Sequence, residues 1–386
     1  MGTGRVEQAD DLAGPVLAAR VATAVAEALA GRTAALVLAH VDHRLDLPLV
    51  TAALQAAAGA APVLGATTGT VYSGTDEQPA VVLVTALGGD DLQVGAAVDA
   101  RPDPTERATV VAERAALGVD SPHRLMIMLP NGTAGDQQAM VLGAYDVLGP
   151  AVSIVGGGAD GDLETNRSWQ FLGTTIVENG LAAAVLGTDR PVGVAAAHGY
   201  SRLGRGMVVT DSDGQLLREL DGRPALDAYL DNLADAGIDV GDRDDEAALT
   251  RLAFAHPLGL ARRRRDEART IVSLDLAART MTFVSTVEAG GLVHPLQGDE
   301  QDMLAGAAQA CDQAVRALGA DPVGMVLFSC IARRALLTEE GRLAELDAAR
   351  DAGCRGEVTL VHSCGEIARV SGSAGCHNQT VVALAF

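Results

Sequence analysis

Residues 151–158 read AVSIVGGG, an apolar run of strand length that ends in a glycine turn. Two other stretches have the same plan: residues 62–69 read PVLGATTG, and residues 358–365 read VTLVHSCG. Short apolar runs bounded by turn residues are typical of buried strands. After each one come a polar loop and a further apolar run, at 181–186, 81–87 and 380–385 respectively. A unit that recurs in this way indicates related halves facing one another, with a crevice between them where a small ligand would sit.

Helical and strand patterns alternate around these units. Ala-rich or amphipathic runs predict helices, several of them closed by glycine; they cover 15–30, 104–117, 133–148, 224–236, 301–318 and 338–352. Between about 171 and 285 the pattern changes to short runs separated by turn residues, which favours antiparallel strands, including one at 251–255. We therefore predict an α/β fold with two lobes of mixed or antiparallel sheets flanked by helices, and a faint internal repeat. The expected domains are residues 1–220 and 221–386.

The balance of acidic and basic residues limits the classes of partner that the protein can bind. The chain of 386 residues has 29 basic and 50 acidic residues and a formal charge of −21. Because nucleic-acid affinity depends on cations that neutralise phosphates, and anionic membranes repel the same charge, we expect neither partner. The run Arg262–Arg265 is followed at once by Asp266 and Glu267, so it is interpreted as a solvated loop.

The cysteines and the absence of lysine indicate the cellular compartment and exclude some types of reaction. The five cysteines include no C-x-x-C pair, which favours a reducing compartment, and no signal peptide is evident at the start of the sequence. No apolar stretch reaches the about 18 residues of a membrane span. We therefore expect a cytoplasmic protein. The chain has no lysine, so Schiff-base and P-loop chemistry are excluded.

Several motifs suggest chemistry but lack its context. Residues 156–161, GGGADG, match G-x-G-x-x-G, but the polar residues after them predict no helix and hence no dinucleotide site. The cluster His40, Asp42 and His43 is interpreted as a polar strand end rather than a metal site. A zinc site from His362, Cys364 and Cys376 is a less favoured alternative. We therefore expect no enzyme, with a metal-dependent enzyme as the minor alternative.

Two polar segments remain as candidates for ligand recognition. His198, Gly199 and Tyr200 follow an apolar strand, and residues 377–380, HNQT, lead into the last one. Open α/β sheets gather ligands at strand ends, so we predict that both segments line one cavity. The turns at Gly69, Gly158 and Gly365 are expected near the same crevice.

The motifs of this chain, in this order, resemble the FIST family (F-box and intracellular signal transduction). Those that carry the resemblance are LGATTG at 64–69, VGGGAD at 155–160, AHGY at 197–200, LDGRPALDAY at 220–229, HPLG at 256–259, VLFSC at 326–330, GEI at 365–367 and HNQT at 377–380. The resemblance implies an N-terminal and a C-terminal FIST domain and a sensory module that binds a small molecule such as an amino acid. Because two such domains would account for the 386 residues, we expect a stand-alone intracellular module that signals to a separate protein. The residues expected to contact the ligand are Thr67, Gly69, Gly158, His198, Gly199, Tyr200, Gly365, Glu366, His377, Asn378 and Gln379.

Some members of the family look like haem proteins that report nitric oxide. Haem is therefore an alternative cofactor, with His198 or His377 as its ligand. The chain departs from the family pattern at the first turn, where GCSTxGE is replaced by GATTGT at 65–70. It also has HSC at 362–364 where the family has a tyrosine. These departures leave the identity of the ligand open.

Overall fold

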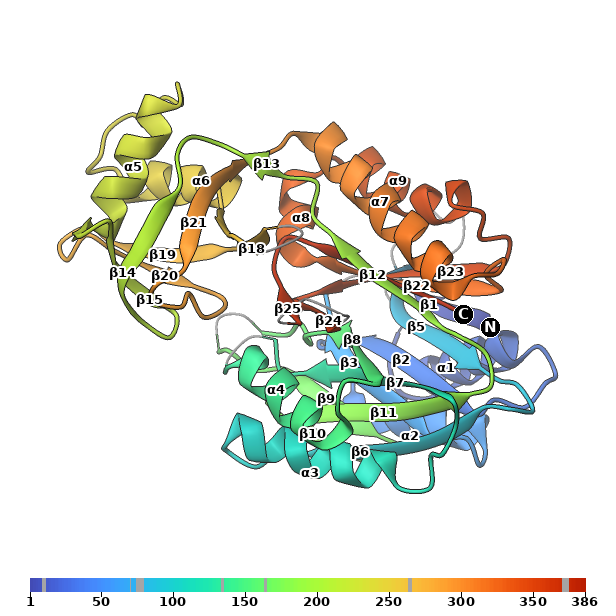
Figure 1. The fold of residues 1–386 in the computed structure, drawn as a ribbon. Helices are drawn as coiled ribbons and strands as arrows, with labels where there is room; N and C mark the ends of the chain where they lie inside the picture. Colours follow the sequence, from blue (N-terminus) through green and yellow to red (C-terminus); the bar gives the residue numbers. More distant parts are fainter. Residues whose placement is uncertain are drawn as a thin grey trace.

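The computed structural model describes residues 1–8, 12–69, 71–73, 80–132, 135–162, 165–262, 266–369 and 375–386. It is a mixed α/β structure with two lobes (Figure 1). The larger lobe contains an 11-stranded and a six-stranded sheet, and the smaller lobe a nine-stranded antiparallel sheet. The predicted fold class is confirmed.

The larger lobe consists of three copies of one unit, which confirms the internal repeat. The prediction that the repeat forms two related halves is wrong, because all three copies belong to one lobe and the smaller lobe has a different sheet. In each copy the second and third strands are parallel, the last strand is antiparallel to the second, and the first strand pairs with the last. The first copy is β1 (Gly2–Glu7), α1 (Gly14–Leu29), β2 (Leu36–Asp42), α2 (Leu47–Ala58), β3 (Val63–Thr68) and β5 (Ala80–Leu87). The second is β6 (Gln93–Asp99), α3 (Pro104–Ala116), β7 (His123–Pro130), α4 (Gln137–Leu148), β8 (Val152–Gly157) and β11 (Leu181–Thr188). The third is β12 (Gly193–Ala197), α7 (Glu300–Leu318), β22 (Gly324–Cys330), α8 (Ile331–Leu336), α9 (Glu339–Asp351), β23 (Glu357–Ser363) and β26 (Val381–Ala385).

Each unit lends a strand to another unit. β4 (Val71–Ser73) of the first unit pairs with β23 of the third, and β24 (Glu366–Arg369) of the third pairs with β8 of the second. β9 (Trp169–Leu172) of the second unit pairs with β3 of the first and continues into β10 (Thr175–Glu178). This cyclic exchange brings the three glycine turns together. Gly158 N donates to Gly365 O at 2.8 Å, and a Cβ on Gly69 would lie 2.6 Å from Asp160 Oδ2.

Helices cover the outer faces of the two sheets, which pack against each other through their inner faces. Leu38 and Phe328 of one sheet share a buried core with Ile127 and Leu129 of the other. Helices α1 and α2 cover one part of the larger sheet, α7 and α9 cover another, and α3 and α4 cover the smaller sheet.

The first strand of every unit packs closely against the first helix of that unit. A Cβ on Gly4, Gly95 or Gly193 would lie 1.9, 2.2 or 1.9 Å from a carbonyl oxygen of α1, α3 or α7, respectively. Only glycine permits such an approach between backbones. The recurrence of this glycine in β1, β6 and β12 is a second sign of the repeat.

The smaller lobe is inserted between β12 and α7 of the third unit, and it has its own core. The expected boundary between residues 220 and 221 falls inside this lobe, where Leu220 pairs with Arg223. The lobe contains β13 (Ser201–Arg202), β14 (Met207–Asp213), β15 (Leu216–Leu220), β16 (Arg223–Pro224), α5 (Ala225–Asp235), α6 (Glu246–Ala255), β17 (Leu258–Leu260), β18 (Glu267–Arg269), β19 (Ile271–Asp275), β20 (Thr280–Phe283) and β21 (Leu292–Gln297).

The strand predicted at 251–255 is wrong, because these residues form the end of helix α6. The side chain of Asp245 caps this helix by accepting a hydrogen bond from Ala248 N. The N-cap aspartate before this apolar run therefore favours a helix over a strand. Helices α2 and α8 were not predicted.

Candidate ligand-binding site

The polar segment before the last strand joins the two lobes. Cys376 and His377 form β25 beside β24, and the segment then contacts the smaller lobe at successive residues. Cys376 Sγ lies 3.5 Å from Ser285 Oγ. Asn378 Oδ1 accepts from Thr270 N at 3.4 Å, and Gln379 Nε2 donates to Phe254 O at 3.1 Å.

The segment that enters the smaller lobe is fixed at the same seam. His198 Nδ1 accepts from Tyr200 N at 2.9 Å, so Nε2 carries the proton and donates to Asp266 O at 2.9 Å. The Tyr200 hydroxyl donates to Gln379 Oε1. Burial raises the pKa of Tyr200, which remains a neutral donor. The two segments singled out in the sequence thus meet through Tyr200 and Gln379.

A cavity of about 550 Å³ lies beside this seam, between the lobes. Its walls come from both lobes. The larger lobe contributes Gly132, Gly135, Gln137, Asn166, Cys330, Ile331, Ala332, Ala335, Cys364, Gly365 and Asn378, and the smaller lobe contributes Gln215, Phe254, Thr270, Val272, Thr282, Phe283 and Val284.

The ionisable groups at the wall of the larger lobe are held neutral. Burial raises the pKa of the Cys330 thiol, and the neighbouring Glu366 raises it further. Burial, and then Asp160, raises the pKa of Cys364. Glu366 is fully buried beside Cys330, and burial raises its pKa well above the usual range of a carboxyl group. Ser363 Oγ donates to its Oε1 at 3.0 Å.

Comparison with family models accounts for most of the chain. The FIST N domain model matches residues 33–223, and the FIST C domain model matches residues 225–369. The chain belongs to the FIST family. FIST domains are associated with sensory signal transduction. No curated protein matches this FIST chain.

Of the predicted contact residues of this FIST protein, Gly365 and Asn378 line the cavity. His198, Gly199, Tyr200, His377 and Gln379 lie outside the described cavity lining, at the seam and along β25. Thr67, Gly69, Gly158 and Glu366 belong to the packed junction of the three units. There Thr67 Oγ1 donates to Asp160 O at 2.6 Å, and Gly158 O accepts from Cys364 N at 2.9 Å. The structure brings together the turns and the two polar segments, but it exposes only part of them to the cavity.

Other residues of the cavity were missed by sequence reasoning. Phe254 and Phe283 are two of the five phenylalanines in the chain, and both line the cavity. In a chain with 3% aromatic residues, a pair of aromatic rings in separate segments was a usable signal. Gln137 was also missed, although its Nε2 donates to Cys364 O at 2.6 Å and so fixes the third glycine turn.

The predicted haem ligands do not fit that role. Both ring nitrogens of His198 bond to backbone atoms, and the ring does not line the cavity. His377 Nε2 donates to Ala368 O at 3.2 Å, and this residue is also outside the cavity lining. An axial haem ligand needs a nitrogen that faces the pocket.

Within the described residues, no cluster of three histidine, cysteine or acidic side chains is placed to hold a metal ion. Asp42 instead bonds to Arg44 at 2.6 Å. His40 is buried, and burial lowers its pKa to about 4. In the candidate zinc site, Cys364 Sγ lies 3.5 Å from Asp160 Oδ1 and Cys376 Sγ lies near Ser285.

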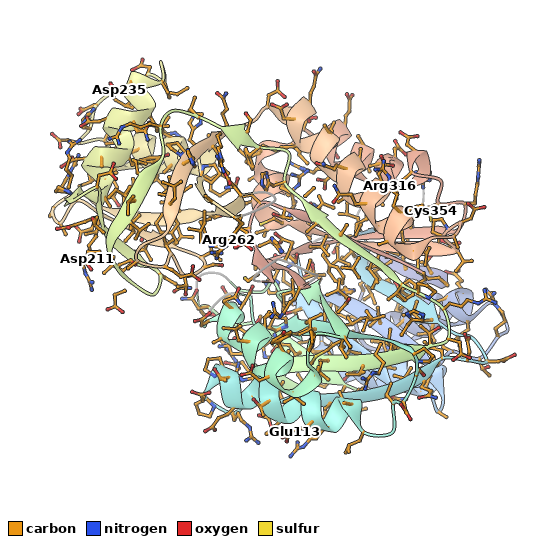
Figure 2. All side chains as sticks on the ribbon, viewed as in Figure 1. Glu113, Asp211, Asp235, Arg262, Arg316 and Cys354 are labelled. Carbon is orange, nitrogen blue, oxygen red and sulfur yellow. The ribbon has the colours of Figure 1, made fainter. Side chains whose placement is uncertain are left out.

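Arg262 is the described residue of the run Arg262–Arg265, and it forms ion pairs with two glutamates. Arg262 lies on the side of the smaller lobe that faces the larger one (Figure 2), and it bonds to Glu267 at 3.0 Å and to Glu288 at 3.3 Å. Residues 263–265 of the predicted solvated loop lie outside the described residues.

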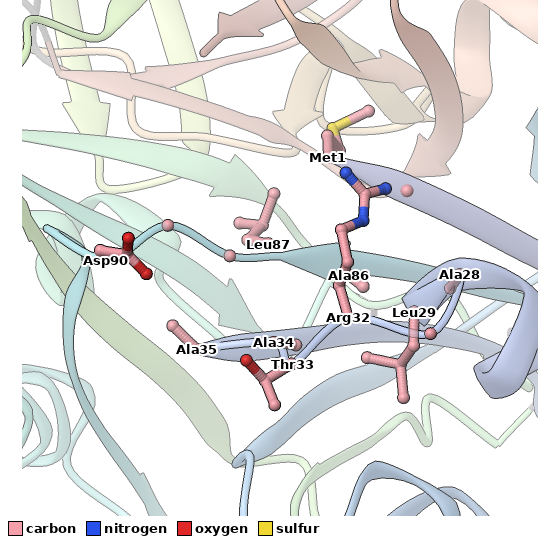
Figure 3. A pocket seen from close by; sticks show the side chains of 14 residues that line it. Met1, Ala28, Leu29, Arg32, Thr33, Ala34, Ala35, Ala86, Leu87 and Asp90 are labelled. Carbon is pink, nitrogen blue, oxygen red and sulfur yellow. The ribbon is translucent and has the colours of Figure 1, made fainter.

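A second pocket, of about 670 Å³, lies at the end of α1 beside Met1 and Arg32 (Figure 3). It is larger than the cavity between the lobes, but none of the predicted contact residues lines it. It also belongs to one unit rather than to the seam, so we do not assign the ligand to it. Among the helices that the structure describes, none is long and apolar enough to cross a membrane.

Proposed function

We propose that this FIST protein is a sensory module that binds a small molecule in the cavity between its lobes and signals to a separate protein. The observation that carries the proposal is that the walls of one cavity come from both lobes, beside the seam that joins them. A ligand that touches both walls stabilises one relative position of the lobes. A change in that position is a signal that a partner can recognise.

The chain paths between the lobes support this role. The smaller lobe is an insertion, so the chain enters it near His198 and leaves it near Gln297. The two crossings are neighbours, because β13 pairs with β21 at Ser201 and Gln297. Two adjacent crossings form a natural hinge, and Gln379 contacts Tyr200 directly beside it.

We further propose binding without catalysis, in a reducing, cytoplasmic environment. Cys330 and Cys364 are the thiols among the described residues of the cavity wall, and burial keeps both protonated. All five cysteines are buried and unpaired, as a reducing compartment favours.

Native mass spectrometry of the purified protein tests the proposal. We expect a co-purified small molecule on the wild-type chain and its loss from Ala335→Trp, which places a large side chain at an exposed position of the cavity wall. Thr33→Trp, at an exposed position of the second pocket, is the matched control and should retain the molecule. If Thr33→Trp loses the molecule and Ala335→Trp keeps it, the site is assigned to the wrong pocket.

A further inference from the structure

We infer that the ligand of the cavity is an uncharged, flat molecule with an apolar ring and a hydrogen-bond donor and acceptor on one edge. This inference rests on the proposed function, because it names the class of molecule that the proposed site accepts. It departs from the amino-acid-like ligand that the sequence suggested, since a free amino acid carries two charges.

The wall of the cavity is uncharged where the structure describes it. Across the described part of the cavity lining, the polar side chains are amides, hydroxyls and thiols, with no acid, arginine or histidine. The two thiols and the adjacent Glu366 are neutral, since burial raises their pKa values. A charged ligand would leave water for a site without a partner of opposite sign, which is strongly unfavourable. The charge of −21 on the whole chain also repels anions.

Two aromatic side chains line the cavity. Phe254 and Phe283 both belong to the smaller lobe, and Ile331 and Ala332 line the cavity from the larger lobe. An apolar wall with aromatic rings favours a flat, apolar body.

Two polar side chains of the wall have hydrogen-bonding capacity that the described residues leave unused. The Thr270 hydroxyl is buried and has no hydrogen-bond partner among the described residues. Asn378 Nδ2 donates to the carbonyl oxygen of its chain neighbour His377, and its Oδ1 accepts a single long bond from Thr270 N. An amide group can donate twice and accept twice, so Asn378 has a donor and an acceptor left for a ligand.

Three probes with the same ring test the inference: benzamide is neutral, benzoate is an anion and benzamidine is a cation. Binding of each is measured by ligand-observed NMR titration at neutral pH. We expect benzamide to bind the wild-type protein at least about tenfold more tightly than either charged probe. Ala335→Trp, or Val272→Trp on the opposite wall, should abolish the binding of benzamide. Asn378→Ala removes a donor and an acceptor from the wall and should weaken the binding of benzamide about tenfold or more.

The outcomes separate the inference from the proposed function. If benzoate or benzamidine binds as tightly as benzamide, and Ala335→Trp abolishes that binding, the site stands but the neutral-ligand inference is overturned. If no probe binds in a way that Ala335→Trp and Val272→Trp abolish, the cavity itself is not a binding site. Thermal unfolding of each variant shows that the chain is folded when binding is measured.

Discussion

Replacing Arg333 with methionine should destabilise the larger lobe more than the same replacement of an exposed arginine. Arg333 is fully buried, and its guanidinium donates to Glu345 Oε1 at 2.7 and 2.8 Å. It also donates to His198 O at 3.0 Å and to Met303 O at 2.8 Å. Methionine fills similar space without the charge or the hydrogen-bond donors, so the variant tests the ion pair and these hydrogen bonds rather than the packing. It leaves the buried Glu345 with Ser329 Oγ, at 2.8 Å, as its remaining described partner.

Removing one member of a buried ion pair costs about 3–5 kcal/mol, because the other charge stays buried without its partner. We therefore expect Arg333→Met to lower the free energy of unfolding by about that amount. Urea denaturation followed by far-UV circular dichroism measures it. The matched control is Arg350→Met, whose partner Asp347 is 65% exposed. Loss of such a surface pair should change the free energy by less than about 1 kcal/mol.

A double variant tests the electrostatic explanation. Arg333→Met combined with Glu345→Leu removes both charges and should recover part of the lost stability. If Arg333→Met is as stable as the wild type, or if the double variant is no more stable than Arg333→Met, the buried ion pair does not stabilise the fold in this way. Because Arg333 holds the carbonyl of His198 at the crossing between the lobes, the single variant should also weaken ligand retention.

Three further predictions concern pH and packing. Burial raises the pKa of Glu366 above its ordinary value of 4.5, so the stability that this group contributes is present below pH 4.5 and is lost as the pH rises. Glu366→Gln should therefore gain stability relative to the wild type between pH 5 and pH 8 in urea denaturation. A stability difference that does not change with pH would contradict the raised pKa. Burial lowers the pKa of His40 from 6.5 to about 4, so the stability that this group contributes is present above pH 6.5 and is lost as the pH falls towards 4. His40→Leu should remove this acid-dependent loss of about 3 kcal/mol in the free energy of unfolding. An unchanged pH profile would show that His40 is not neutral in the fold. Gly193→Ala should lower the free energy of unfolding by about 1–3 kcal/mol, because the added Cβ would lie 1.9 Å from Ala314 O. An unchanged free energy of unfolding in the same assay would mean that α7 can move away from β12.

The sequence predicted the repeated strands better than their arrangement. The runs around 62–69, 151–158 and 358–365 were recognisable because buried strands need continuous apolar residues. The cyclic exchange of β4, β9 and β24 was not recognisable, because pairing between distant strands leaves no local pattern. For the same reason the insertion of the smaller lobe between β12 and α7 was missed.

The candidate site was predictable in part. Asn378 and Gly365 were identified because a polar residue or a glycine stands out beside an apolar strand. His198 and Gln379 stood out equally, but their polar atoms bond to the protein itself. Phe254 and Phe283 were missed because their segments, α6 and β20, look like ordinary core elements. The sequence shows which groups are polar, whereas the fold decides which of them remain available to a ligand.

A crystal structure of the protein with its co-purified molecule would show directly where the ligand binds. We expect electron density for an uncharged molecule in the cavity between the lobes, within hydrogen-bonding distance of Asn378 and in contact with Phe283. Density for the molecule beside Met1 and Arg32, with the cavity between the lobes filled only by water, would contradict it.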